Sequence, residues 1–542
     1  MDELVSSENP IRIIDAFVEK LDMAELEFER STPEDEGRPG FSPKDMLKLY
    51  IYGYFDGIKS SRRLERECMR NIEVRWLLNN LAPDFRTISN FRRDNKLSIK
   101  RVFKSFNQIC RKAGAMTGGY VSIDGSKFEA VNSKDNNFTL SELDDRISRL
   151  DGHIEEYLNQ LEENDTDKER SLTREELEAK IKECEERKAR YEGYRRQLEE
   201  SGESQLSTTG PEARLMKTSA GFDVCYNTQM AVEEGSHMIA EYEVTDSPTD
   251  HGQLTNLASK VKEDCGAEVL EVTADKGYRS PSDIADALAN GIVPNVIRLD
   301  GRLTTDVEYS LNEAQITEEQ RCSTKPKDLR RCLESVVIPE AYKDILIDIE
   351  IIERTETVID ESFVQNMSEE EMKALAKSGY FVRDPRRNLV WCPEGNILRL
   401  KSIKKDGRMR FCNKLACKEC PVKCTKSPFK EADFGKDTLV LRSTTRHRDD
   451  DNKPDKGNRV KKEKRTFKVV RYKLRLDQNK MNNRKCLSEH PFGTIKLTMN
   501  GGWMLLKGKA KVEAEMALLC IGYNLRRAIS ILGVQKMVKA MA

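Results

Sequence analysis

The chain has 542 residues, of which 34% are charged and 38% are hydrophobic, and its formal net charge at pH 7 is −1. This length allows several domains and at least one sizeable core. No apolar run approaches the roughly 20 residues that a membrane helix needs. The first residues are neither basic nor apolar, so we expect no secretory signal and no membrane partner, and a cytoplasmic location in which the 14 cysteines stay mostly reduced.

The near-neutral total hides an uneven distribution of charge along the chain. Residues 399–485 carry 29 Lys and Arg against 11 Asp and Glu, and a Glu-rich stretch at about 140–203 balances them. A charge run is usually a solvated surface, but a block this long and this one-sided is also typical of a surface that binds a polyanion. Both interpretations stay open at this point.

The N-terminal part is predicted to be helical. One helix is expected at residues 10–21, and an acidic linker follows to residue 40. Helical spacing of apolar residues then predicts five short helices, at 42–57, 61–69, 74–78, 88–93 and 98–113. Their polar sides carry the arginines Arg62, Arg63, Arg92 and Arg93. We interpret residues 41–115 as a helix-turn-helix-like DNA-binding domain, the alternative being a helical bundle with ordinary surface arginines.

Two strands that end in an acid form the centre of a predicted sheet. The strand at 120–123 leads into Asp124 and Gly125, and the strand at 269–274 leads into Asp275. Either acid alone could simply begin a turn. Two acids at the ends of neighbouring strands could instead hold divalent cations, because such cations prefer several carboxylate oxygens at once.

The surrounding elements predict a mixed α/β sheet. A strand, a turn and a second strand cover residues 221–244, and the Asp275 strand, two helices and a strand at 292–297 follow. The order of three antiparallel strands, helix, strand, helix and strand matches an RNase H-like core, in which the first and fourth strands are neighbours. We assign residues 116–138 and 207–300 to the first part of this core.

The segment at 139–206 interrupts the predicted core. Thr139 with Glu142 and Thr173 with Glu176 are capping-box patterns, and each opens an amphipathic helix. We interpret the segment as an inserted antiparallel helical hairpin, with an arm for dimerisation as the alternative. Residues 301–388 form an insertion of uncertain structure, in which we expect only helical fragments and loops.

A cysteine cluster lies in a second insertion, at 389–430. Its close spacing allows Cys392, Cys417, Cys420 and Cys424 to reach one zinc ion, with Cys412 as a spare. Four sulfur ligands without an open position indicate a structural zinc knuckle. The alternative is a set of reduced cysteines in a loop that holds without metal.

The last part, 431–542, contains the basic segment and the C-terminal helices. Glu489 and Lys496 are seven residues apart, so both can lie on one helix face if the helix continues past Pro491. Glu489 could then complete a metal site while Lys496 meets phosphate, although solvated Glu and Lys pairs are common. Glu515 is a secondary candidate for the third acid.

Several motifs together resemble the bacterial insertion-sequence transposases of the DDE type. They are Ser-Ile-Asp-Gly-Ser-Lys at Asp124, Ala-Asp-Lys-Gly-Tyr at Asp275, Glu-His-Pro-Phe-Gly-x-x-Lys at Glu489, and Tyr-Asn-Leu-Arg-Arg at 523–527. Related transposases often carry Tyr-x-x-Arg before the Glu, and here Asn482 and Lys485 stand at those positions, with Arg484 one place early.

The resemblance implies a polynucleotidyl transferase with Asp124, Asp275 and Glu489 as its catalytic acids. Two Mg²⁺ or Mn²⁺ ions would be held by these acids, and Lys496, Arg484 and Lys485 would contact DNA. The implied partners are double-stranded DNA, as terminal inverted repeats and as target, and further copies in a homodimer or larger assembly. The alternatives are an RNase H-like nuclease without strand transfer and a non-catalytic DNA-binding derivative.

Overall fold

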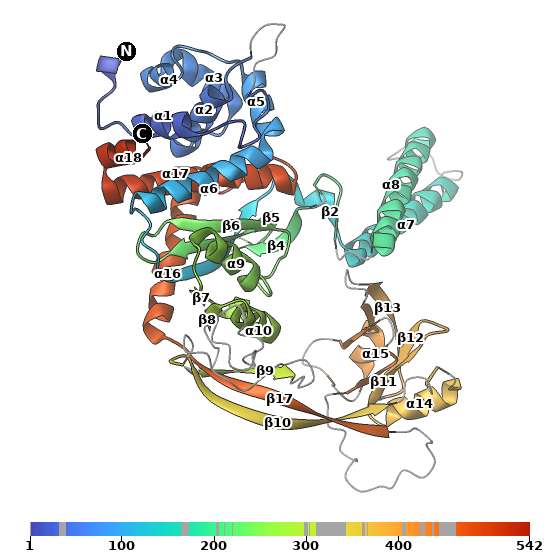
Figure 1. Ribbon diagram of the computed structural model, residues 1–542. Helices are drawn as coiled ribbons and strands as arrows, with labels where there is room; N and C mark the ends of the chain where they lie inside the picture. The colour runs from blue at the N-terminus through green and yellow to red at the C-terminus, as the bar shows by residue number, and fades with distance from the viewer. Residues whose placement is uncertain are drawn as a thin grey trace. The chain divides into compact units, whose positions relative to one another are not determined.

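The computed structural model divides the chain into two compact units (Figure 1). The first comprises Met1–Asn136, Ser207–Glu353 and Lys468–Ala542, and the second comprises Asn137–Leu206 and Arg354–Phe467. The structure describes residues 2–31, 40–163, 173–201, 205–210, 212–218, 221–296, 302, 304–310, 343–359, 364–365, 367–403, 408–420, 422, 424, 429–435, 438–443 and 462–541. Each unit is a mixture of helices and strands, so the chain is a mixed α/β protein.

The central sheet of the first unit joins strands that are far apart in sequence. Its members are β1 (Val121–Glu129), β4 (Arg214–Thr218), β5 (Gly221–Glu233), β6 (Ile239–Thr245), β7 (Leu270–Ala274) and β8 (Ile292–Val296). The order is β4-β5-β1-β7-β8, and β6 pairs with the later part of β5. β1 is antiparallel to β5 and parallel to β7, which is parallel to β8. The first and fourth core strands predicted from sequence are therefore neighbours.

Helices cover this sheet and continue its core. α9 (Leu254–Cys265), α10 (Pro281–Ala289) and α16 (Gln478–Gly493) pack against its strands, and α17 (Lys509–Leu532) packs against β6. Nearly every residue of β5 from Val224 to Val232 is buried, which requires cover on both faces of the strand. The short elements are the 3-10 turns Asp2–Leu4, Lys134–Asn136 and Lys276–Tyr278, and the strands β2 (Asn137–Phe138) and β3 (Leu206–Ser207).

The N-terminal helices agree with the sequence prediction to within a few residues. They are α1 (Ile11–Lys20), α2 (Pro43–Phe55), α3 (Ser61–Arg70), α4 (Ile72–Leu77), α5 (Phe85–Asp94) and α6 (Lys96–Lys112). Side-chain caps explain several of their starts: Ser42 accepts a hydrogen bond from the Lys44 amide, and Asn71 and Asp84 cap α4 and α5.

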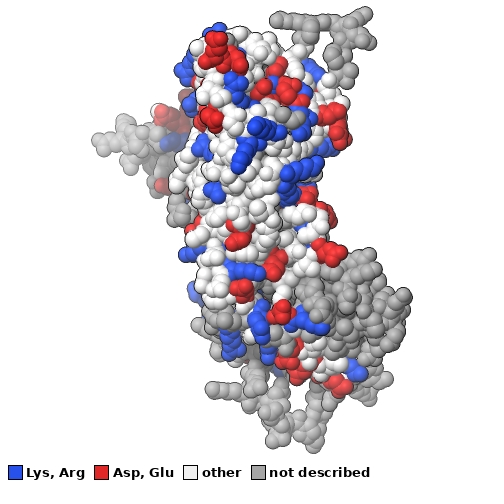
Figure 2. All heavy atoms as spheres, turned by 60° about the vertical axis from the view of Figure 1, so that its left-hand side comes forward, with Lys and Arg blue, Asp and Glu red and all other residues white. Residues whose placement is uncertain are grey.

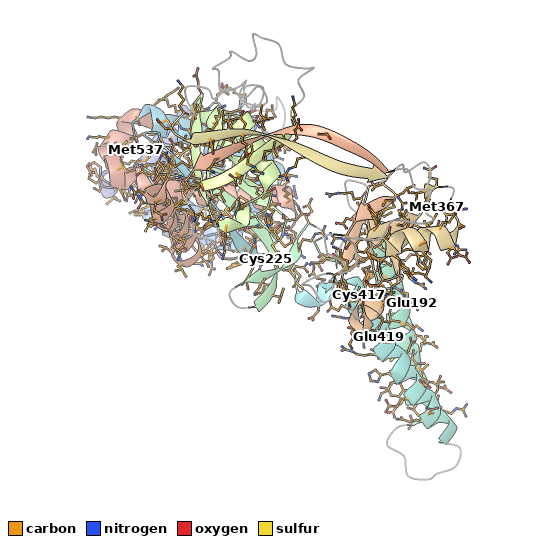
Figure 3. All side chains as sticks on the ribbon, turned by 90° about the horizontal axis from the view of Figure 1, so that it is seen from below. Glu192, Cys225, Met367, Cys417, Glu419 and Met537 are labelled. Atoms are coloured by element: carbon orange, nitrogen blue, oxygen red, sulfur yellow. The ribbon has the colours of Figure 1, made fainter. Side chains whose placement is uncertain are left out.

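These N-terminal helices share one hydrophobic core with the sheet. α6 and α2 pack against α17, and α1 packs against α18 (Val534–Met541), as the adjacent blue and red ribbons in Figure 1 show. Fully buried Met537 of α18 belongs to the same core (Figure 3). Removing the N-terminal helices would therefore expose part of the core that supports the sheet.

No single helix among the described segments is long and apolar enough to cross a membrane. Judged by length and composition alone, α17 and α18 meet this criterion only when they are taken together, as a pair bent by 114°.

The expectation of only helical fragments in 301–388 is wrong. β9 (Thr304–Ser310) and β10 (Leu346–Ile359) form a three-stranded sheet with β17 (Lys462–Arg475), in the order β10-β17-β9. The alternation Ile347-Asp348-Ile349-Glu350-Ile351 is a strand pattern. Its partner strand lies more than 100 residues later in the chain, which is why the local sequence did not reveal the sheet.

The second unit contains the predicted helical hairpin and a further sheet. The hairpin consists of α7 (Leu140–Glu163) and α8 (Arg174–Ser201), which pack on each other. The sheet has the order β15-β14-β13-β12-β11-β16 and is antiparallel throughout. The strands of this sheet are β11 (Tyr380–Asp384), β12 (Leu389–Trp391), β13 (Ile397–Ile403), β14 (Met409–Cys412), β15 (Glu431–Phe434) and β16 (Val440–Arg442). The second unit also contains the helices α14 (Glu369–Lys377) and α15 (Lys414–Glu419).

Candidate active site

Two aspartates lie side by side at one edge of the central sheet. The parallel pairing of β1 and β7 ends with Ile123 opposite Ala274, so Asp124 and Asp275 follow directly on neighbouring strands. Asp275 Oδ1 accepts a hydrogen bond of 2.7 Å from the Gly277 amide, which fixes its carboxylate at the start of a 3-10 turn. Burial raises the pKa of Asp124; nearby Arg484 opposes this rise, and the negative charge of Asp275 adds to it.

Helix α16 brings two further side chains to Asp124. Arg484 Nη1 lies 3.3 Å and Ser488 Oγ 3.1 Å from Asp124 Oδ2. Residues four apart share a helix face, and both side chains are buried. Arg484 therefore contacts Asp124 in this structure, whereas the sequence suggested that it contacts DNA.

Glu489 lies one residue beyond this contact. α16 continues through Pro491 to Gly493, so the helix that the Glu489 hypothesis needs is present. Glu489 itself is exposed, and one residue corresponds to a rotation of about 100° from the face that carries Ser488. Within the described ranges, no three His, Cys, Asp or Glu side chains are placed to hold one metal ion together.

Glu515, the secondary candidate, lies inside the core. Its carboxylate accepts hydrogen bonds of 2.9 to 3.1 Å from the backbone amides of Leu505 and Leu506. Lys59 Nζ lies 3.4 Å from Glu515 Oε1, and both side chains are buried. These contacts give Glu515 a structural role in joining α17 to the N-terminal helices.

A third acid near the aspartate pair was not identified from the sequence. Asp250 lies between β6 and α9, and its Oδ1 accepts hydrogen bonds from Asn227 Nδ2 at 2.9 Å and Gln229 Nε2 at 2.7 Å. Burial raises the pKa of Tyr278, and the charges of Asp250, Asp124 and Asp275 raise it further. The only local sequence signal for this site is Asp250, followed two residues later by Gly252, in the loop after a strand.

Lys496 already has partners within the fold. Its Nζ donates hydrogen bonds of 2.7 Å to Ser126 Oγ and to the Lys127 carbonyl, and it lies 4.7 Å from the centre of the Phe128 ring. Burial lowers the pKa of Lys496. In this conformation the ammonium group supports β1, although the sequence suggested a contact with phosphate.

The predicted DNA-contacting residues differ in exposure. Arg62 and Arg63 of α3 are exposed, as are Lys485 and Arg93, which pairs with Asp94 at 2.6 Å. Arg92, in contrast, is buried and donates a hydrogen bond of 2.8 Å to Tyr54 Oη. The expectation that Arg92 faces DNA therefore does not fit this structure, because its guanidinium is part of the helical core.

One face of the protein carries charges of both signs (Figure 2). Figure 2 shows a face on which Lys and Arg side chains alternate with Asp and Glu. Much of the basic block at 399–485, including 444–461, lies outside the described residues.

Several cysteines of the second unit lie on or near the short helix α15. Cys417, which Figure 3 labels, is on α15. Cys420 follows this helix, and Cys392 follows β12. Burial raises the pKa of Cys392, and Cys420 is among its electrostatic neighbours. Burial also raises the pKa of Cys424, with contributions from Cys417 and Cys392. The four cysteines singled out from the sequence thus lie in one region of the second unit, but no three of these described residues are placed to hold one metal ion, and none of the four forms a disulfide.

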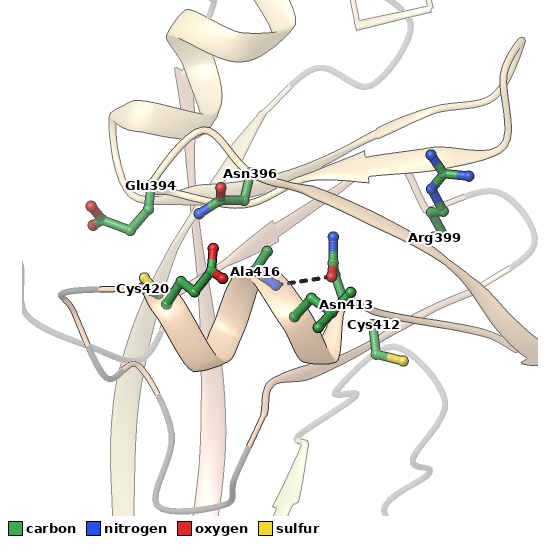
Figure 4. A pocket seen from close by; sticks show the side chains of 9 residues that line it. Glu394, Asn396, Arg399, Cys412, Asn413, Ala416 and Cys420 are labelled. Carbon is green, nitrogen blue, oxygen red and sulfur yellow. Dashed lines mark hydrogen bonds between the residues drawn. The ribbon is translucent and has the colours of Figure 1, made fainter. Parts of the chain in front are cut away.

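A pocket of about 830 Å³ borders this helix (Figure 4). Cys412 and Cys420 lie at opposite ends of α15, and Asn413 Oδ1 accepts a hydrogen bond of 3.0 Å from the Ala416 amide between them. The other lining residues are Glu394, Asn396, Arg399, Leu415 and Glu419. Cys392 is an electrostatic neighbour of Cys420, and Cys412 is an electrostatic neighbour of Cys417.

Two family models match the chain. Residues 1–94 match a model described as "Transposase domain (DUF772)", and residues 391–529 match one described as "Transposase DDE domain". The first match covers α1 to α5, and the second includes Arg484, Ser488, Glu489 and Lys496. No curated protein matches the chain. These two matches support an insertion-sequence transposase of the DDE type.

Proposed function

We propose that this transposase binds the terminal inverted repeats of its element and cuts and joins DNA strands with divalent cations held by Asp124, Asp275 and Glu489. The observation that carries the proposal is the position of Asp124 and Asp275 on adjacent parallel strands. The strand order β6-β5-β1-β7-β8, with helices after β6 and β7, supports an RNase H-like core.

The donor groups fit hard divalent cations such as Mg²⁺ or Mn²⁺. Asp124 and Asp275 offer carboxylate oxygens at one sheet edge, and Glu489 is on the helix that contacts Asp124. Two bound cations would activate the attacking water or 3′-hydroxyl and stabilise the leaving oxygen.

The protein's own side chains orient these acids. Arg484 and Ser488 hold Asp124 Oδ2, and the Gly277 amide holds Asp275. Lys496 fixes the backbone of β1 just after Asp124 through the Lys127 carbonyl. A rigid arrangement of this kind keeps the carboxylates in place for the reaction.

A strand-transfer assay tests the proposal. The full-length protein, the flanking DNA of its element and Mg²⁺ should yield joined products. Cleavage without joined products would favour an RNase H-like nuclease, which uses the same acids. DNA binding without cleavage would favour a non-catalytic derivative.

Exposed arginines of α3 are proposed to contact the element ends. Replacing Arg62 and Arg63 together by Ala should weaken binding to end DNA at least tenfold and reduce the salt dependence, because each lost phosphate contact lowers the slope by roughly one. Fluorescence anisotropy across a salt series measures both quantities.

A matched control removes two positive charges elsewhere. Lys536 and Lys539 of α18 are exposed, and their double replacement by Ala should leave binding nearly unchanged. Equal losses in the two double variants would show that α3 has no special role. Point variants are preferable to deleting the N-terminal helices, because these helices belong to the shared core.

A structural zinc ion is proposed for Cys392, Cys417, Cys420 and Cys424. Their position in one region of the second unit supports it, and zinc prefers such sulfur ligands. Binding one ion would require the thiols to move closer together than they lie in this structure. Replacing Cys420 by Ser should remove one zinc per chain in metal analysis and lower the melting temperature. Replacing Cys412 should retain the metal. Purified protein without zinc at any stoichiometry would contradict this assignment.

A further inference from the structure

Asp250 has one oxygen fixed by two buried amides. Asn227 and Gln229 lie two positions apart on β5, so both side chains point to the same face of the sheet. Both are at most 1% exposed, and both donate to Asp250 Oδ1. The Asp250 side chain is 25% exposed, so the carboxylate is held in place yet reachable from solvent.

The other oxygen of Asp250 lies close to the turn that follows Asp275. A β-carbon placed on Gly277 would lie 2.9 Å from Asp275 Oδ1 and 3.6 Å from Asp250 Oδ2, so the two carboxylates approach a common point. A β-carbon placed on Gly125, the residue after Asp124, would lie 2.6 Å from Asp250 Oδ1. Asp250 is therefore packed against the backbone that carries both predicted catalytic acids.

This arrangement brings several oxygen acceptors together, with Arg484 beside Asp124 and Lys127 beside Asp250 as nearby cationic side chains. Lys127 Nζ is 3.8 Å from Asp250 Oδ1. The Asn227 amide oxygen is fully buried, lies 3.1 Å from the same Gly125 β-carbon position, and has no hydrogen-bond partner in the described part of the chain. Clustered acids and an unpaired acceptor are stabilised when a cation is bound.

We propose that Asp250 is a further acidic residue of the Asp124–Asp275 site, that it faces the bound divalent cation, and that Asn227 and Gln229 orient it. Metal-binding carboxylates are commonly held by such hydrogen bonds through their other oxygen. The inference rests on the proposed function, because it assumes that the aspartate pair binds a cation.

Mn²⁺ titration of the full-length protein without DNA tests the inference, with free Mn²⁺ followed by electron paramagnetic resonance. Asp250→Asn keeps an oxygen that can accept from Asn227 and Gln229 but removes the charge. It should weaken Mn²⁺ binding about tenfold or more and leave the melting temperature unchanged. Asp246→Asn is the matched control, because Asp246 lies in the same loop and pairs with Arg214 at 3.8 Å.

The variants Asp124→Asn and Asp275→Asn distinguish a failure of the role of Asp250 from a failure of the proposed function. If these two variants lose Mn²⁺ binding and Asp250→Asn binds like the unaltered protein, the role of Asp250 is overturned and the proposed function stands. If all three variants bind Mn²⁺ normally, the cation site at the aspartate pair and the role of Asp250 are both overturned.

Discussion

Replacing Asp124 by Asn should abolish DNA cleavage and joining while DNA binding persists. Stabilisation of charge by bound cations contributes several kcal/mol to the transition state, and each 1.36 kcal/mol is tenfold in rate, so the loss should be roughly a thousandfold or more. Ser488 can still donate to the Asn side chain, so the site should keep its shape. Asp275→Asn should have a similar effect.

The measurement is a gel assay of cleavage and strand transfer, with binding to the same DNA followed in parallel. Asp286→Asn is a suitable control, because Asp286 is an exposed acid on α10. Near-normal strand transfer by either the Asp124 or the Asp275 variant would contradict the assignment.

Glu489→Gln extends this test to the third acid. The same loss of activity is expected, because two cations need more than two carboxylates. If the Gln variant remains active while Asp124→Asn is inactive, Glu489 is not the third acid, and Asp250 becomes the nearest candidate.

Replacing Glu515 by Ala should destabilise the first unit by about 3–5 kcal/mol, the range for breaking a buried ion pair. Lys59 would lose its charged partner, and the amides of Leu505 and Leu506 would lose their acceptor. Burial already lowers the pKa of Lys59, and the charge of Glu515 opposes that effect. Glu515→Gln should cost less, because its side-chain oxygen can still accept one amide.

Urea unfolding, followed by circular dichroism and by fluorescence, measures this loss. The control is Glu513→Ala, two residues earlier in α17: Glu513 pairs with partly exposed Lys100 at 3.0 Å, so a change of at most about 1 kcal/mol is expected. A Glu515→Ala protein of normal stability that cannot cut DNA would instead assign Glu515 to catalysis.

The helices were predictable from sequence because their start signals are local. Ser42 with Pro43, Asn71 and Asp84 each satisfy an amide at a helix start, and the apolar spacing that follows requires no distant partner. The adjacency of β1 and β7 was also predictable, since short strands alternating with helices favour parallel neighbours.

Features that depend on distant partners were not predictable in this way. β17 pairs with β9 across more than 150 residues, and the strands around Cys412 and Cys420 form one antiparallel sheet. Asp250 was overlooked because its importance comes from amides on β5. Arg92 and Lys496 show that positive charge alone does not predict exposure, since Tyr54 and the Lys127 carbonyl hold them inside.

Because the first helices pack against the last ones, the N-terminal core cannot be completed until the C-terminal helices have been synthesised. Lys20 Nζ donates a hydrogen bond of 3.3 Å to the Ala540 carbonyl, 520 positions later. At about 5–20 residues per second, the ribosome needs roughly half a minute to two minutes to travel that distance. During this interval the apolar faces of α1, α2 and α6 that pack on α17 and α18 lack these partners. The nascent chain should therefore be a substrate for chaperones until α18 emerges.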